Sequence, residues 1–202
     1  MFRDLIGRTI AMVSLATALV AVAIALDLPR TGGDAGHGAH GVAGTAHAPI
    51  ASEAAFLAAM VPHHQEAVDV ALEVVTSGER PEVRALAAEI VATQAQEIAQ
   101  LRAWLDAWYP DEPAAAYEPM MRNLEGLTPP AVDVVFVLDM IHHHEMALAM
   151  AEEVLGLRPP PRPEVVELAR EIVRVQGEEI EVLQAWIDAW WPAGALRNHE
   201  EH

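Results

Sequence analysis

The sequence predicts an all-α protein, a four-helix bundle built from two duplicated helical hairpins. The first reason is an internal repeat. Residues 80–110, RPEVRALAAEIVATQAQEIAQLRAWLDAWYP, and 162–192, RPEVVELAREIVRVQGEEIEVLQAWIDAWWP, are identical at 19 of 31 positions. Residues 58–75 and 138–155 also resemble each other. The second reason is that each repeat contains two long stretches of helical pattern with a short break between them, which is typical of an antiparallel helix pair.

Capping residues and prolines bound the four predicted helices. Ser52 is a suitable N-cap, and Ser77 with Gly78 is expected to end the first helix near residue 76. The other three helices each have a proline at their start, at positions 81, 129 and 163. The second helix should end before Pro110, the third at Gly156 and the last before Pro192. The predicted bundle covers residues 51–192, with repeat one in 53–110 and repeat two in 131–192.

A connection of residues 111–130 joins the repeats, and one turn of helix is expected within residues 117–124. Helices of about 25 to 30 residues are about 40 Å long. The connection therefore either crosses the whole bundle, as in ferritin-like folds, or stays at one end. The sequence leaves both topologies open.

The N-terminal segment is typical of a targeting sequence. Arg3 and Arg8 precede an uncharged apolar stretch, so residues 1–26 are expected to be a signal peptide or an N-terminal membrane anchor. Both alternatives place the remaining chain outside the cytoplasm, whether periplasmic, secreted or membrane-anchored. Residues 27–50 are rich in Gly, Ala and His and predict a flexible linker, and residues 193–202 predict a flexible tail.

The composition excludes several functions. The chain has no cysteine, so disulfides, thiolate metal sites and cysteine nucleophiles are excluded. Its 30 acidic and 12 basic residues give a net charge of −18, which disfavours nucleic acid as a partner. No phosphate loop, dinucleotide fingerprint or nucleophile elbow is present.

Polar residues gather at the middle of the predicted bundle. The first and third helices each have two adjacent histidines near their centres, and the second and fourth each have a Gln-x-x-Glu pair. A residue at the centre of a helix stays at mid-height whichever way the helix runs. Bundles build metal sites at this level. These central residues are His63, His64, His143, His144, Gln94, Glu97, Gln176 and Glu179.

Methionines accompany the histidines at helical spacing. Met60 and Met140 each stand three residues before the histidine pair of their repeat, on the same helical face. Met146 and Met150 continue this stripe in repeat two. Thioether and imidazole ligands without thiolate favour Cu(I), or Ag(I) in its place, whereas imidazole alone would accept Cu(II) or zinc.

Each of these residues also has a plain structural interpretation. Methionine often fills a core, and a buried histidine is usually held by hydrogen bonds. The metal interpretation is favoured because both repeats keep the same Met and His-His unit, and a buried imidazole costs more than leucine unless its nitrogens have partners. The glutamines and glutamates are either partners that orient imidazoles or plain interhelical hydrogen-bonding groups. His142 points further away and is the weakest candidate of its triplet.

The motifs MVPHHQEAVDVA (60–71) and MIHHHEMALAMA (140–151) resemble those of the bacterial family known as domain of unknown function 305, over about residues 53–192. The resemblance implies a ferritin-like bundle, export from the cytoplasm and, as in copper-resistance members, binding of copper or silver. By position, the implied ligands are Met60, His63, His64, Met140, His143, His144, Met146 and Met150.

Repeat one departs from this pattern, because Glu66 and Val70 stand where repeat two has Met146 and Met150. The difference predicts either one site served unequally by both halves or a poorer site in repeat one. Glu66 is itself an alternative ligand that would favour harder ions.

The favoured function is a non-catalytic, extracytoplasmic protein that sequesters or delivers copper, with the metal ion as its partner. We expect contact with the membrane only through the N-terminal segment. The sequence leaves open whether the protein forms a homo-oligomer. One alternative is a di-metal carboxylate oxidase holding iron, although the order of its Glu and His residues does not match the known pattern. The other is a pH-sensitive helical interaction module, since imidazole titrates near neutrality.

Overall fold

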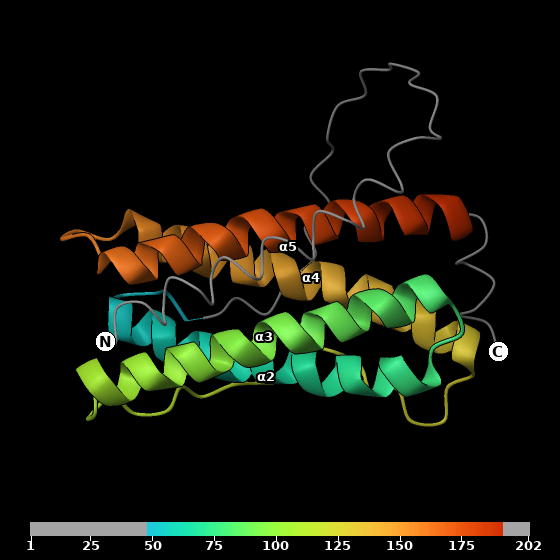
Figure 1. The fold of residues 1–202 in the computed structure, drawn as a ribbon, viewed down its shortest axis with the longest axis horizontal. Helices are drawn as coiled ribbons and strands as arrows, with labels where there is room; N and C mark the ends of the chain where they lie inside the picture. The colour runs from blue at the N-terminus through green and yellow to red at the C-terminus, as the bar shows by residue number, and fades with distance from the viewer. Residues whose placement is uncertain (1–47, 192–202) are drawn as a thin grey trace, which may run out of the picture. The chain divides into compact units, whose positions relative to one another are not determined.

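The computed structural model describes residues 48–191, which form four helices (Figure 1). These are α2 (Glu53–Ser77), α3 (Pro81–Trp108), α4 (Pro129–Gly156) and α5 (Pro163–Trp190). No strand occurs in these residues. The prediction of an all-α four-helix bundle is confirmed. The predicted leader, most of the linker and the tail lie outside the described residues. Ile50, which the sequence placed at the end of the linker, is buried, and its N–H donates to Glu153 of α4.

The helices begin where the sequence predicts. The Ser52 hydroxyl accepts a hydrogen bond of 3.0 Å from the backbone N–H of Ala55, which caps α2. Proline occupies the start of the other three helices. The N-cap residues of α3 and α5, Arg80 and Arg162, provide no side-chain cap of their own.

Acidic residues near the starts of α2 and α4 supply these caps across the two repeats. Fully buried Asp133 of α4 accepts from the backbone N–H groups of Glu79 (3.0 Å) and Arg80 (2.9 Å). Its counterpart in repeat one, Glu53, accepts from the backbone N–H of Arg162 (2.5 Å). The start of α4 therefore lies beside the start of α3, and the start of α2 beside the start of α5. Because α3 starts directly after the end of α2, the start of α4 lies beside the end of α2, and the two helices run antiparallel.

Gly78, which follows the last residue of α2, is required by this arrangement. A Cβ atom at this position would lie 2.9 Å from both Asp133 Oδ1 and the backbone carbonyl oxygen of Val74, which is closer than a Cβ contact allows. Its φ of −66° is ordinary, so the reason for glycine here is the lack of space beside these two oxygens rather than a left-handed conformation.

The connection between the repeats crosses the whole bundle and runs alongside α2 from the end of α3 to the start of α4 (Figure 1). The helical turn expected within residues 117–124 is absent, and that prediction is wrong. Helical side chains satisfy the backbone of this segment instead. Glu66 of α2 accepts from the N–H groups of Met120 (2.8 Å) and Met121 (2.9 Å), and Asp139 of α4 accepts from that of Arg122 (2.8 Å).

The apolar core consists of two clusters, one toward each end of the bundle. The first contains Phe136 and the second contains Phe56, both fully buried. The polar residues of the middle of the helices lie between them. Among the described helices, α4 alone is long and apolar enough to cross a membrane, judged by length and composition. However, it carries the buried Asp133, and much of it faces this core.

Cation–π contacts join the ends of α3 and α5. The Arg80 guanidinium at the start of α3 lies 4.3 Å from the ring centre of Trp190 at the end of α5. In the other repeat, Arg162 lies 4.6 Å from Trp108. Each pair brings the start of one helix against the end of the other, as the repeat symmetry requires.

Candidate metal centre

Four imidazoles form one layer in the middle of the bundle. His63 and His64 come from α2, and His143 and His144 from α4, and all four are at most 1% exposed. Because α2 and α4 are antiparallel and both pairs lie at mid-helix, the two repeats meet at this level. The sequence prediction that the central histidines share one height is matched by their positions. Whether they bind a metal stays a prediction.

His63 and His143 make the closest contact between the repeats. Their ring centres are 3.7 Å apart, with the planes tilted by 35°. The Nε2 atom of His143 lies 3.0 Å from the carbonyl oxygen of His63. A carbonyl only accepts hydrogen bonds, so this contact assigns the proton of His143 to Nε2. Its Nδ1 then carries a lone pair, and no hydrogen-bond partner reaches it within residues 48–191.

The remaining two imidazoles each lie beside a glutamate of the helix paired with their own. His64 Nε2 lies 2.8 Å from a carboxylate oxygen of Glu97, and His144 Nε2 lies 2.7 Å from one of Glu179. The distances are short, but the ring N–H is not directed along the line to the oxygen. Both Nδ1 atoms are buried without a hydrogen-bond partner among the described residues. The two repeats therefore build the same imidazole–carboxylate pair.

The surroundings keep His143 neutral. Burial lowers the pKa of His143 well below its usual value, and the neighbouring His144 and His64 lower that pKa further. A neutral imidazole is the form that binds metal ions.

The candidate thioethers lie on both sides of the imidazole layer. Met60 and Met150 belong to the apolar cluster that contains Phe56, and Met140 to the other cluster. These three are almost fully buried, whereas Met146 is partly exposed. Since α2 and α4 are antiparallel, the methionine before each histidine pair lies on the opposite side of the layer from its counterpart.

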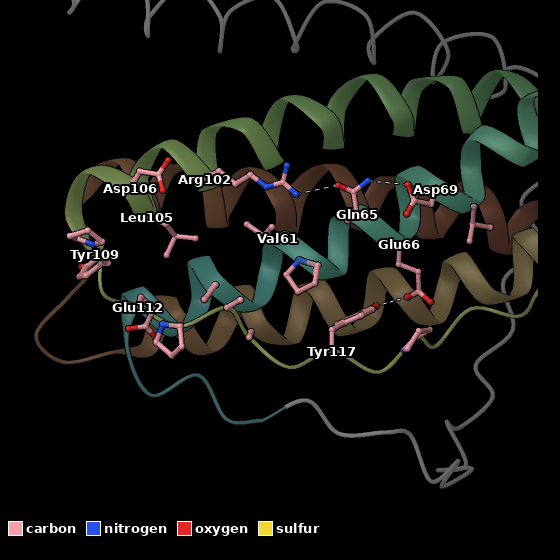
Figure 2. Close-up of a pocket in the computed structure, with 18 residues that line it drawn as sticks. Val61, Gln65, Glu66, Asp69, Arg102, Leu105, Asp106, Tyr109, Glu112 and Tyr117 are labelled. Carbon is pink, nitrogen blue, oxygen red and sulfur yellow. Dashed lines mark hydrogen bonds between the residues drawn. The ribbon is translucent and has the colours of Figure 1, made fainter.

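Glu66 has a role that the sequence did not reveal. Besides binding the connection at Met120 and Met121, it accepts a short hydrogen bond from the hydroxyl of Tyr117 (Figure 2). Burial raises the pKa of Tyr117, and the neighbouring Glu66 raises it further. The same carboxylate lies 3.6 Å from His143 Nε2. The connection therefore uses most of the acceptor positions of Glu66. In the sequence, the only indication of this role was that repeat one has Glu66 where repeat two has Met146.

A cleft of about 620 Å³ adjoins this carboxylate on the outer side of α2 (Figure 2). It lies between α2, the C-terminal half of α3 and the connection. Gln65 of α2 accepts a hydrogen bond from Arg102 of α3 and thereby joins two walls, and it donates to Asp69 on its own helix. The cleft gives solvent a path to the neighbourhood of Glu66 and Tyr117.

The other predicted residues lie near or outside this layer. His142 is exposed and lies 3.7 Å from Glu145, so it faces away from the layer. Gln94 and Gln176 are 97% buried, and the side-chain oxygen of each has no hydrogen-bond partner in the described part of the chain. Over residues 48–191, no three His, Asp or Glu side chains are gathered closely enough to hold an ion without some rearrangement.

Comparison with known proteins gives the family. The model of the domain of unknown function DUF305 matches residues 53–132, 110–187 and 133–201. The chain belongs to the DUF305 family. No curated protein matches it.

The similar solved structures include metal-bound forms of the protein CopM. CopM in a silver-bound form is 31% identical, with a TM-score of 0.60 over 69% of this chain and 98% of that one. CopM in its Cu(I)-bound form is 30% identical with the same TM-score and the same coverage. A DUF305 protein from Streptomyces coelicolor, described as a candidate secreted protein, is 25% identical with a TM-score of 0.59, over 69% of this chain and 94% of that one.

Proposed function

We propose that this DUF305 protein binds Cu(I), or Ag(I) in its place, in the imidazole layer between α2 and α4, and that it sequesters or delivers the ion outside the cytoplasm. The observation that carries the proposal is the meeting of two histidine pairs from separate repeats in a buried layer flanked by methionines. The metal-bound structures of CopM, a similar protein, support the choice of ion.

The donor atoms fit a soft monovalent ion. The Nδ1 atoms of His64, His143 and His144 are buried without hydrogen-bond partners among the described residues, which is costly unless something binds them. The thioethers of Met60 and Met140 flank the layer, and repeat two contributes two further methionines, Met146 and Met150. Thioether and imidazole together select Cu(I) over harder ions.

The carboxylates act indirectly in this proposal. Glu97 and Glu179 lie beside the Nε2 atoms of His64 and His144, where they orient each ring and leave its other nitrogen for the ion. Glu66 holds the connection rather than the metal. A di-metal oxidase needs carboxylates that bridge two ions. The engagement of Glu66 with three donors of the connection gives no support to that alternative.

The proposed location follows from the N-terminal sequence. Residues 1–26 have the pattern of a signal peptide or anchor, and the Streptomyces coelicolor relative is described as a candidate secreted protein. In an oxidising compartment, thioether and imidazole ligands have the advantage that they do not form disulfides.

The test is titration of the full-length protein with Cu(I) against a competing chelator. The H63A/H143A variant should lose more than about 100-fold in affinity, since even loss of a group that only orients a ligand costs about 10–100-fold. The matched control is H142A, which removes an exposed histidine from the same triplet and should bind like the unmodified protein. Equal affinity in all three proteins would reject the proposal.

A further inference from the structure

A small polar pocket lies between α3 and α5, and its lining includes the two glutamates that lie beside His64 and His144. Its cavity of about 10 Å³ has room for one water-sized particle. Thr93, Gln94 and Glu97 of α3 line it together with Gln176 and Glu179 of α5, and isoleucine and valine side chains complete the wall.

The two glutamines in this pocket have buried oxygens that lack hydrogen bonds. Gln94 and Gln176 are each 97% buried, and neither side-chain oxygen has a partner within the described residues. An unpaired buried amide oxygen destabilises the fold, because it loses its bond to water and gains none in return. The sequence nevertheless has glutamine at this position in both repeats, whereas leucine would fill the space without that cost.

The charge around the pocket is negative. Glu97 and Glu179 contribute two carboxylates, and no arginine lines the cavity. Burial raises the pKa of nearby Glu89, and the charge of Glu179 raises that pKa further. A cation placed in this cavity would be attracted by both carboxylates.

We infer that the α3–α5 pocket is a second, oxygen-donor site that binds one hard divalent cation, of the Mn²⁺ or Ca²⁺ class. Its ligands are the amide oxygens of Gln94 and Gln176 and the carboxylates of Glu97 and Glu179, with the Thr93 hydroxyl as a further oxygen within the lining. Amide, carboxylate and hydroxyl oxygens are the donors that such ions prefer over imidazole and sulfur. The carboxylates reach solvent, with 15% and 13% of their side chains exposed, so the ion keeps waters on its outer side.

This site differs in its donor atoms from the proposed soft-metal site, with which it shares the residues Glu97 and Glu179. It uses amide and carboxylate oxygens, whereas Cu(I) would use imidazole nitrogens and thioethers. The carboxylates of Glu97 and Glu179 have room for both tasks, because an ionised carboxylate offers about four lone-pair positions.

The test is a titration of the full-length protein with Mn²⁺ alone, near physiological ionic strength, followed by the loss of the free-ion electron paramagnetic resonance signal. Salt screens weak binding to the acidic surface. One Mn²⁺ should bind above that background, and the Q94L/Q176L variant should lose at least about tenfold in affinity for it. The control is Q96L, which changes an exposed glutamine on α3 and should bind like the unmodified protein.

Thermal unfolding gives a second readout, in which the variant is expected to gain stability rather than to lose it. Without metal, Q94L/Q176L should melt above the unmodified protein, because two unpaired oxygens are gone. Added Mn²⁺ should raise the melting temperature of the unmodified protein but not that of the variant. Competition between Mn²⁺ and Ca²⁺ then ranks the two ions.

Mn²⁺ binding that is weak, multiple and equal in all variants would overturn the inference. The fate of the soft-metal proposal is read separately, because Q94L/Q176L should keep its Ag(I) affinity within about twofold. A loss of Ag(I) binding in H63A/H143A with Mn²⁺ binding intact would support both sites at once.

Discussion

The two repeats build the same imidazole layer but differ at one helical turn beyond it. In repeat one, Glu66 points to the connection and binds Tyr117, Met120 and Met121. In repeat two, the same position is Met146, which is partly exposed and carries no charge. The imidazole–carboxylate contacts, by contrast, agree to within 0.1 Å, at 2.8 and 2.7 Å.

This difference shows how a duplicated hairpin divides two tasks. At the level of Glu66 the connection passes alongside α2, so repeat one needs a group that holds it there, whereas Asp139 of α4 binds it further on, at Arg122. Repeat two has no such segment to hold at this position, and it keeps Met146 and buried Met150, which are candidate soft donors in the proposed site. The asymmetry in methionine content thus follows from the topology.

The largest change in stability is expected from a substitution at Glu66 that removes this difference between the repeats. The E66M variant gives repeat one the residue of repeat two, and it leaves two backbone N–H groups and the Tyr117 hydroxyl without their acceptor. The free energy of unfolding should fall by about 2–4 kcal/mol. Urea unfolding followed by tryptophan fluorescence measures this change, and Ag(I) affinity should not fall.

The reciprocal control is M146L. It keeps the apolar volume, so the free energy of unfolding should change by less than about 1.5 kcal/mol, whereas Ag(I) affinity should decrease. If E66M weakened Ag(I) binding while its stability stayed normal, the division of tasks would be wrong.

The imidazole–carboxylate pairs, which both repeats build alike, are expected to contribute equally to binding. E97Q and E179Q should each lower Ag(I) affinity by about tenfold, and by similar amounts, because each removes the carboxylate beside one imidazole. E178Q changes the adjacent, exposed glutamate of α5 and should have no effect. A large loss in one variant with none in the other would mean that a single repeat binds the ion.

The smallest expected effect concerns the two cross-repeat caps and their pH dependence. Burial raises the pKa of Glu53, but hydrogen bonds from the Arg162 backbone, the Tyr109 hydroxyl and the Arg162 guanidinium outweigh burial, so the pKa is lowered. Burial dominates at its counterpart Asp133, whose pKa is raised. The ionised form is therefore favoured by folding at Glu53 and disfavoured at Asp133.

The two caps should respond to acid in opposite ways. The stabilisation by Glu53 is present above its unfolded pKa, about 4.3, and is lost as pH falls through the folded value. The contribution of Asp133 is present below its unfolded pKa, about 3.9, and is lost as pH rises through the folded value. Relative to the unmodified protein, E53Q should lose about 1 kcal/mol at neutral pH and less in acid, whereas D133N should lose more in acid. Melting curves from about pH 3 to 7 check this, and parallel trends would contradict it.

Sequence predicted the helices and the level of the imidazole layer because both depend on local signals. Prolines and Ser52 set the helix starts, and a central histidine is at mid-height in either topology. The direction of the connection could not be predicted, because it depends on long-range bonds. Glu66, Asp133 and Asp139 each bind backbone N–H groups that are 17 to 55 residues away in the chain. Nothing in their local sequence distinguishes them from solvated acidic residues.

The arginines that contact the tryptophans also could not be predicted from the sequence. Trp108 and Trp190 occupy equivalent positions, which a repeat alignment finds. Their contacts with Arg162 and Arg80 come from the opposite repeat, so they appear only once α3 and α5 are placed together.

The most direct test of the account is anomalous X-ray scattering from crystals of the protein soaked with Ag(I). We predict a silver peak in the layer between α2 and α4, within bonding distance of imidazole nitrogens from both repeats and of at least one methionine sulfur. Silver found only at surface histidines such as His142, with none between the two helices, would contradict the account.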